Sequence, residues 1–115
     1  MAIDLNFLLV LKSSGLGDGE PDLGEKLLKT FLAILFESGH FPARIICLNS
    51  GIFLTTGASE ASETLEKFQS QGTQILSCST CLEYYGRKDL LAIGDSTTMK
   101  DTVSAMLSFE RVIQP

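Results

Sequence analysis

The chain has 115 residues, of which 44% are hydrophobic, so we expect one core and a single domain over residues 1–115. Its net charge of −5 and its scattered basic residues argue against a nucleic acid partner. No apolar run approaches the roughly 20 residues of a membrane helix, and residues 1–4 do not resemble a signal peptide, so we expect a cytoplasmic protein without a membrane partner.

The chain begins with a predicted strand, a loop and a long helix. Residues 5–11 form a nearly continuous apolar run, which is typical of a strand buried on both faces of a parallel sheet. A flexible loop over residues 13–20 follows it. Asp22 and Glu25 then predict a capping box at the start of a helix that ends at about Ser38.

The later part of this helix is unusual because residues 31–36 are apolar on every face. This pattern indicates either deep burial against the sheet or contact with another subunit.

A second unit of strand, loop and helix follows this helix. We expect the strand at residues 43–48, the loop at residues 49–57, and the helix from Ser59 to Gly72.

Residues 74–86 predict a buried strand, a small polar turn and a helix that begins at a cysteine. Ser79 and Thr80 are residue types that cap the first turn of a helix, which would place Cys81 within that turn. The unpaired N–H groups and the helix dipole at this position favour a thiolate and can lower the pKa of a thiol. Cys81 is therefore a candidate nucleophile.

The end of the chain predicts a short helical turn, a weak strand at residues 94–97, a helix and a last short strand at residues 111–113. Thr98 and Asp101 predict a capping box for the helix. The apolar stripe expected on this helix consists of Met99, Val103, Met106 and Leu107.

Strands and helices thus alternate along the whole chain. This order predicts an α/β fold with three α/β/α layers and a mostly parallel five-stranded sheet. In such sheets ligands bind beyond the carboxyl ends of the strands. We therefore expect the functional site among the loops at residues 13–20, 49–57 and 77–81.

The motif Cys78-x-x-Cys81 is open to four interpretations. A thioredoxin-like dithiol would need a suitably placed proline loop, and a zinc site would need Cys47 and His40 as further ligands. In the third interpretation Cys81 accepts and releases sulfur as a persulfide, with Cys78 as its neighbour or resolving thiol. In the fourth, both cysteines are ordinary small residues of a turn.

Two other features give weaker signals. The sequence Gly15-x-Gly17 begins like a dinucleotide-binding fingerprint, but Glu20 occupies the third glycine position and acidic residues nearby would repel phosphate. A flexible turn is the favoured interpretation of this segment. A flavodoxin-like nucleotide binder is a further alternative for the function, after a sulfur-relay protein and a binding or scaffold module. His40 follows a helix stop and is expected to be a surface residue.

The cysteine segment also resembles a known family. Residues 78–86 (Cys-Ser-Thr-Cys-Leu-Glu-Tyr-Tyr-Gly) closely resemble the segment Cys-Gly-Thr-Cys-Leu-Asp-Tyr-Tyr-Gly of YedF-like proteins, a branch of the DsrE/DsrF-like superfamily. Further segments similar to the same proteins are residues 17–20 with 23–24, residues 49–51 with 54–55, and residues 111–113. Together these segments extend the resemblance over essentially the whole chain.

The resemblance implies a DsrE/F-like domain that assembles into trimers or hexamers and handles sulfur through a loop cysteine. By position, Cys81 matches the family's second cysteine and is the expected acceptor, and Cys78 matches the first. The YedF branch is named for selenium metabolism, so selenium is also an implied cargo. This chain lacks the TusA-like half with its Cys-Pro-x-Pro motif, so the sulfur donor or acceptor is expected to be a separate protein, such as a TusA-like one.

The sequence therefore predicts a homo-oligomeric sulfur-relay protein that needs no cofactor and no metal. The alternative is a scaffold or binding module with inert cysteines. Besides the two cysteines, the residues expected to form the pocket are Ser14, Gly15, Asn49, Ser50, Gly51, Ser79, Thr80 and Tyr84. Tyr84, Tyr85 and Phe53 are expected to line either this pocket or a subunit boundary.

Overall fold

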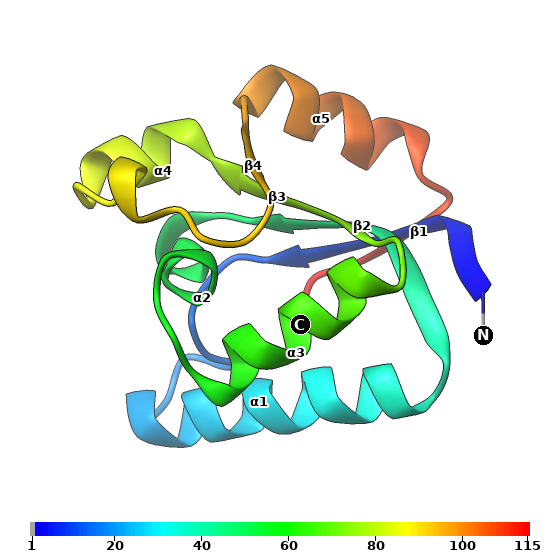
Figure 1. Cartoon of the computed structure of the whole chain (residues 1–115), viewed down its shortest axis with the longest axis horizontal. Helices are drawn as coiled ribbons and strands as arrows, with labels where there is room; N and C mark the ends of the chain where they lie inside the picture. Colours follow the sequence, from blue (N-terminus) through cyan, green and yellow to red (C-terminus); the bar gives the residue numbers. More distant parts are fainter. Residues whose placement is uncertain (1) are drawn as a thin grey trace.

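The computed structural model describes residues 2–115, which form a five-stranded sheet with helices on both faces (Figure 1). The strands are β1 (Ala2–Leu11), β2 (His40–Cys47), β3 (Gln74–Cys78), β4 (Asp95–Thr97) and β5 (Arg111–Ile113). The helices are α1 (Pro21–Glu37), α2 (Phe53–Thr56), α3 (Glu60–Ser70), α4 (Ser79–Tyr84) and α5 (Met99–Ser108). Two short 3₁₀ helices are η1 (Asn49–Ile52) and η2 (Lys88–Leu90).

All the paired strands are parallel, in the order β4-β3-β2-β1-β5, which confirms the predicted fold class. Helices α1 and α3 cover one face of the sheet, and α5 covers the other (Figure 1). Because the strands are parallel, their carboxyl ends meet at one edge, where α2 and α4 lie (Figure 1). The candidate site lies at this edge.

The two faces of the sheet differ in how much apolar surface they bury. The core between the sheet and helices α1 and α3 contains 16 buried residues, whereas the core beneath α5 contains five. Phe36, Phe41 and Phe68 pack together in the larger core with ring centroids 5.1 to 5.7 Å apart. No helix within residues 2–115 combines the length and the apolar character that crossing a membrane requires.

The start of α1 differs from the prediction. The helix begins at Pro21 with Glu20 at the N-cap, and no side chain caps it, so the predicted capping box of Asp22 and Glu25 is wrong. Proline suits the first helical position because it has no N–H to satisfy and its φ is already helical. Later in α1, Leu32 is fully buried but Ile34 is 60% exposed, so burial within the chain does not account for the whole apolar segment.

Helix α5 faces the sheet mostly with a different side from the one predicted. Its buried residues are Thr102 and Ala105, and Met106 of the predicted stripe is partly buried against the core beneath α5, whereas Met99, Val103 and Leu107 are exposed. The periodicity was correct, but the helix packs its small side chains against the sheet, and small residues allow a close approach. The N-cap bond of the expected capping box is present, since the Thr98 side chain accepts a hydrogen bond from the Asp101 N–H.

Candidate functional site

The loops after β1 and β2 are joined at the carboxyl edge of the sheet. The Leu48 N–H donates to the Leu11 carbonyl at 2.9 Å, and the Ser14 N–H donates to the Ser50 hydroxyl at 3.1 Å. The segment after β2 was predicted as a loop, but it forms η1 and α2 instead. Two successive helical turns hold this segment more rigidly than a loop would.

The second cysteine of the motif lies at the third residue of α4. Cys78 occupies the N-cap position with an extended backbone, and no side chain caps the helix. Ser79 and Thr80 are therefore the first two helical residues, and the prediction that they cap the helix is wrong. The prediction that Cys81 lies in the first turn is confirmed, and its side chain is half-buried.

The sulfur of Cys81 accepts a hydrogen bond from the chain after β2. The backbone N–H of Asn49 donates to Cys81 Sγ at 3.1 Å. The side chain of the same asparagine is held by Tyr85, whose hydroxyl donates to Asn49 Oδ1 at 2.7 Å. A backbone N–H directed at sulfur stabilises the thiolate more than the thiol.

The expected lowering of the Cys81 pKa is nevertheless wrong for this structure. Burial, followed by a hydrogen bond with Cys78, raises the pKa of Cys81 above its ordinary value of 9.0, and the Asn49 N–H only opposes this rise. Arg87 adds no compensating contact at the sulfur, because its guanidinium lies 4.3 Å from the Phe53 ring centroid and donates to Thr56 Oγ1 at 3.2 Å. The sulfur is therefore mostly a thiol at neutral pH.

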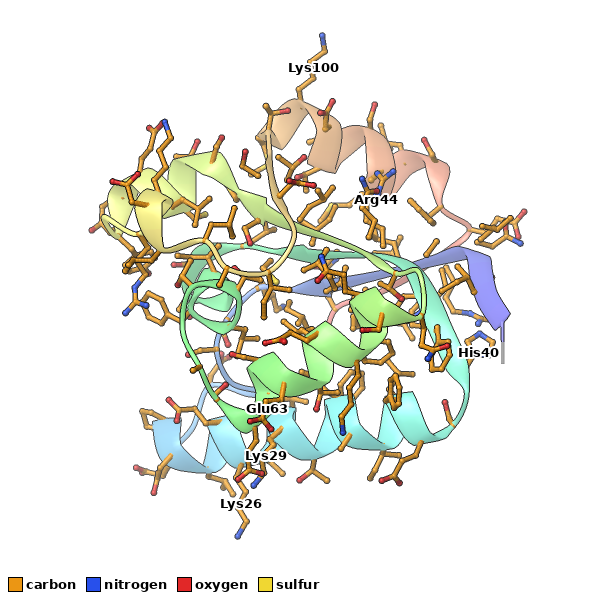
Figure 2. The ribbon with its side chains drawn as sticks, in the orientation of Figure 1. Lys26, Lys29, His40, Arg44, Glu63 and Lys100 are labelled. Carbon is orange, nitrogen blue, oxygen red and sulfur yellow. The ribbon has the colours of Figure 1, made fainter. Side chains whose placement is uncertain are left out.

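The other two cysteines are less accessible. Cys47 is fully buried in β2, which raises its pKa to about 12, and Cys78 is 1% exposed. His40 begins β2 whereas Cys47 ends it, and Figure 2 shows His40 at the edge of the sheet away from α2 and α4. Among residues 2–115 no three His, Cys, Asp or Glu side chains gather in a way that could hold a metal ion.

His40 belongs instead to a surface cluster at the amino-terminal ends of β1, β2 and β5. Its Nε2 lies 2.8 Å from Asp4 Oδ2, and Arg111 lies 3.4 Å from the same oxygen. Hydrogen bonds from the Asn6 N–H and from His40 hold the pKa of Asp4 below its ordinary value. This cluster ties the strand ends together at the edge opposite to Cys81.

Not all predicted pocket residues gather around Cys81. Of them, Asn49 hydrogen-bonds its sulfur, whereas Ser14 lines a separate cavity of about 400 Å³ together with Phe53. Tyr84 is 83% exposed. Gly15 packs closely against the backbone of Gly24, Ser50 accepts the bond from Ser14 described above, and Gly51 lies against Leu11.

One buried contact at this edge was not predicted. The hydroxyl groups of Thr55 and Ser77 lie 2.7 Å apart and join α2 to the end of β3. Ser77 is fully buried between the apolar Leu76 and Cys78 of β3, and a buried hydroxyl needs a hydrogen-bond partner. A polar residue inside a buried strand could therefore have indicated a buried hydrogen bond at Ser77, although the sequence does not identify its partner.

We expect the three cysteines to differ widely in alkylation rate. In the folded protein iodoacetamide should modify Cys81 first, because Cys78 and Cys47 are almost inaccessible. The rate at Cys81 should keep rising with pH up to 9.0 and beyond, since its pKa is raised. Peptide mass spectrometry over time measures this order, with urea-unfolded protein as the control. Native modification of Cys47 as fast as that of Cys81 would contradict the structure.

Comparison with solved structures identifies the fold. The YchN protein of Escherichia coli superposes with a TM-score of 0.68 at 17% identity, covering 96% of this chain and 100% of that protein. This chain has the fold of YchN. Two proteins of unknown function are similar as well: MTH1491 of Methanobacterium thermoautotrophicum (TM-score 0.67, 15% identity) and BT1422 of Bacteroides thetaiotaomicron (TM-score 0.65, 16% identity).

These two likenesses also extend over whole chains. The first covers 97% of this chain and 100% of MTH1491, and the second covers 96% of this chain and 95% of BT1422. No family model and no curated protein matches the sequence. At such low identity the likeness concerns the fold, while the chemistry has to be argued from the residues of this chain.

Proposed function

We propose that this protein carries sulfur as a persulfide on Cys81. In the loading step the Cys81 thiolate attacks the terminal sulfur of a donor persulfide, a new S–S bond forms, and the donor leaves as a thiolate. In the release step an acceptor thiolate attacks the terminal sulfur on Cys81, and Cys81 leaves as a thiolate. Each step exchanges one S–S bond for another, so neither an oxidant nor a reductant is consumed.

The observation that carries this proposal is the setting of the Cys81 sulfur. It is half-buried, it accepts a backbone hydrogen bond from Asn49, and it lies at the carboxyl edge of a parallel sheet. A sulfur carrier needs an accessible thiol and a donor group that stabilises the thiolate each time it attacks or leaves. Cys47 and Cys78 are too buried to meet an external donor.

We further assign the chain to the YedF-like branch of the DsrE/DsrF-like superfamily. The motif at residues 78–86 supports this assignment, and the shared fold agrees with it. The same assignment makes a separate protein, such as a TusA-like one, the proposed donor or acceptor, and it includes selenium as a possible cargo. A cytoplasmic location fits such a partner.

We also propose that the protein is a homo-oligomer, a trimer or hexamer. Exposed apolar side chains on the outer sides of α1 and α5 support this, since neither set is covered within the chain; they are Leu23, Leu27 and Ile34 on α1, and Met99, Val103 and Leu107 on α5. Light scattering at micromolar concentration should therefore give a particle of at least three chains. A particle with the mass of one chain would contradict this proposal.

Sulfur transfer in both directions tests the proposed function. We expect the protein, incubated with glutathione persulfide and then desalted, to gain the mass of one sulfur atom per chain. Addition of a protein thiol acceptor should remove that sulfur and add it to the acceptor. Loading should be faster at higher pH because the pKa of Cys81 is raised. A protein that gains no sulfur at any pH between 7 and about 9 would refute the relay.

One observation favours the alternative of a scaffold with inert cysteines. Burial and Cys78 raise the pKa of Cys81, whereas a strongly activated nucleophile has a lowered one. The scaffold predicts no sulfur gain together with normal oligomerisation. The same pair of measurements, intact mass and light scattering, therefore separates the two functions.

A further inference from the structure

Asn49 has an unusual backbone conformation beside the Cys81 sulfur. Its φ is 52°, in the left-handed region, and it is the one residue other than glycine with positive φ in the described part of the chain. Asparagine tolerates this region better than most residues, but the conformation still costs free energy and has to be held by its surroundings. In this conformation the Asn49 N–H points at Cys81 Sγ.

The group that holds Asn49 comes from the residue that ends the helix carrying the sulfur, since Tyr85 is the C-cap of α4. Tyr85 follows Cys81 by one helical turn, and its backbone N–H donates to the Cys81 carbonyl at 3.1 Å. The Tyr85 hydroxyl donates to Asn49 Oδ1. Asn49 therefore bridges two points of one helix turn, with its side chain bonded to Tyr85 and its backbone N–H bonded to Cys81.

The ring of Tyr85 is itself fixed by packing. It meets the Phe53 ring edge-on at a centroid distance of 4.8 Å, and the Arg87 guanidinium lies over Phe53. Arg87 is in turn hydrogen-bonded to Thr56 in α2. These contacts place the half-buried tyrosine ring beside Phe53 with its hydroxyl at Asn49.

We propose that Tyr85 is a positioning residue whose hydroxyl holds Asn49 in the conformation that directs its backbone N–H at the Cys81 sulfur. The purpose of this hydrogen bond rests on the proposed function, because the Asn49 N–H stabilises Cys81 each time Cys81 becomes a thiolate in loading or release. Removal of the hydroxyl leaves Asn49 free to relax toward ordinary φ values. The N–H then turns away, and the thiolate loses its backbone donor.

The test is the pH profile of Cys81 alkylation in Tyr85→Phe, measured without any sulfur donor. We expect alkylation at neutral pH to be about three- to tenfold slower than in the unmodified protein. We also expect the apparent pKa of Cys81 to be higher. The matched control is Tyr84→Phe, which removes a hydroxyl from an exposed side chain but keeps the ring that packs edge-on against Tyr85 at a centroid distance of 5.2 Å, so its profile should be unchanged.

A second variant checks that the effect acts through Asn49. Asn49→Ala keeps the backbone N–H but removes the oxygen that Tyr85 binds, and alanine disfavours positive φ, so the N–H should turn away from Cys81. Its pH profile should resemble that of Tyr85→Phe, and adding Tyr85→Phe to it should cause no further change. If Tyr85→Phe does not fold, the profile of Asn49→Ala alone decides, since an unchanged profile there overturns the proposal.

Two results would overturn the positioning role. One is a Tyr85→Phe profile that matches the control, and the other is a rate that falls equally at every pH, which indicates a merely structural effect. Both are independent of sulfur transfer. If the protein fails to load sulfur but shows the shifted profile, the positioning role stands and the relay is refuted. If it loads sulfur but the profile of Tyr85→Phe matches the control, the relay stands and the positioning role is refuted.

Discussion

Cys81→Ser is expected to abolish sulfur loading while leaving the fold intact. Serine is close in size to cysteine, and its hydroxyl oxygen can still accept the hydrogen bond from the Asn49 N–H. A hydroxyl cannot form a persulfide at all, so the mass gain after incubation with glutathione persulfide should disappear completely. Intact-mass spectrometry measures the gain, and a thermal melt checks the fold.

The matched control for this change is Cys47→Ala. Cys47 is fully buried and its pKa is raised to about 12, so it contributes no thiolate at neutral pH. The control should lose some stability, because a buried sulfur is removed, and keep its full sulfur gain. Loading that persists in Cys81→Ser and disappears in Cys47→Ala would assign the sulfur to Cys47 and contradict the proposal.

Gly51→Ala is expected to be strongly destabilising. A Cβ on Gly51 would overlap the Leu11 carbonyl oxygen, which already accepts the hydrogen bond from the Leu48 N–H. Either the strand end or η1 has to move, so overpacking and a weakened backbone bond act together. We expect a loss of about 2–4 kcal/mol in the free energy of unfolding, which lowers Tm by on the order of 10 °C.

Gly19→Ala is the control for the glycine change. A Cβ at Gly19 meets no atom within 4 Å. Because surface substitutions of this kind change stability little, the Tm of this variant should lie within about two degrees of that of the unmodified protein. Thermal melts of the two variants under one buffer give the comparison. Equal melting temperatures for Gly51→Ala and Gly19→Ala would show that the contact with Leu11 does not constrain the fold.

The order of strands and helices could be predicted because apolar runs and helix stops coincide in this sequence. The first strand is nearly continuously apolar over residues 5–11, and Gly39 and Gly72 take the positive φ that ends the helices before them. The side of α5 that faces the sheet could not be predicted, because its apolar residues Met99 and Val103 form a helical stripe that lies on the outer side. Periodicity defines a face but not its partner.

The candidate site was predictable only in part. The position of Cys81 in a first helical turn follows from local sequence, whereas its contact with Asn49 joins segments 32 residues apart. The expected pKa was wrong because burial opposes the helix terminus, and burial depends on the whole fold. The hydrogen bond from Tyr85 to Asn49 joins residues 36 apart, and a single sequence carries no sign of it.

The decisive experiment on sulfur transfer is to find which cysteine carries the transferred atom. The unmodified protein is loaded with glutathione persulfide, trapped with an alkylating reagent, digested and sequenced by tandem mass spectrometry. We expect one extra sulfur atom, on Cys81, and none on Cys47 or Cys78. Extra sulfur on either buried cysteine and none on Cys81, or no extra sulfur on any peptide, would contradict it.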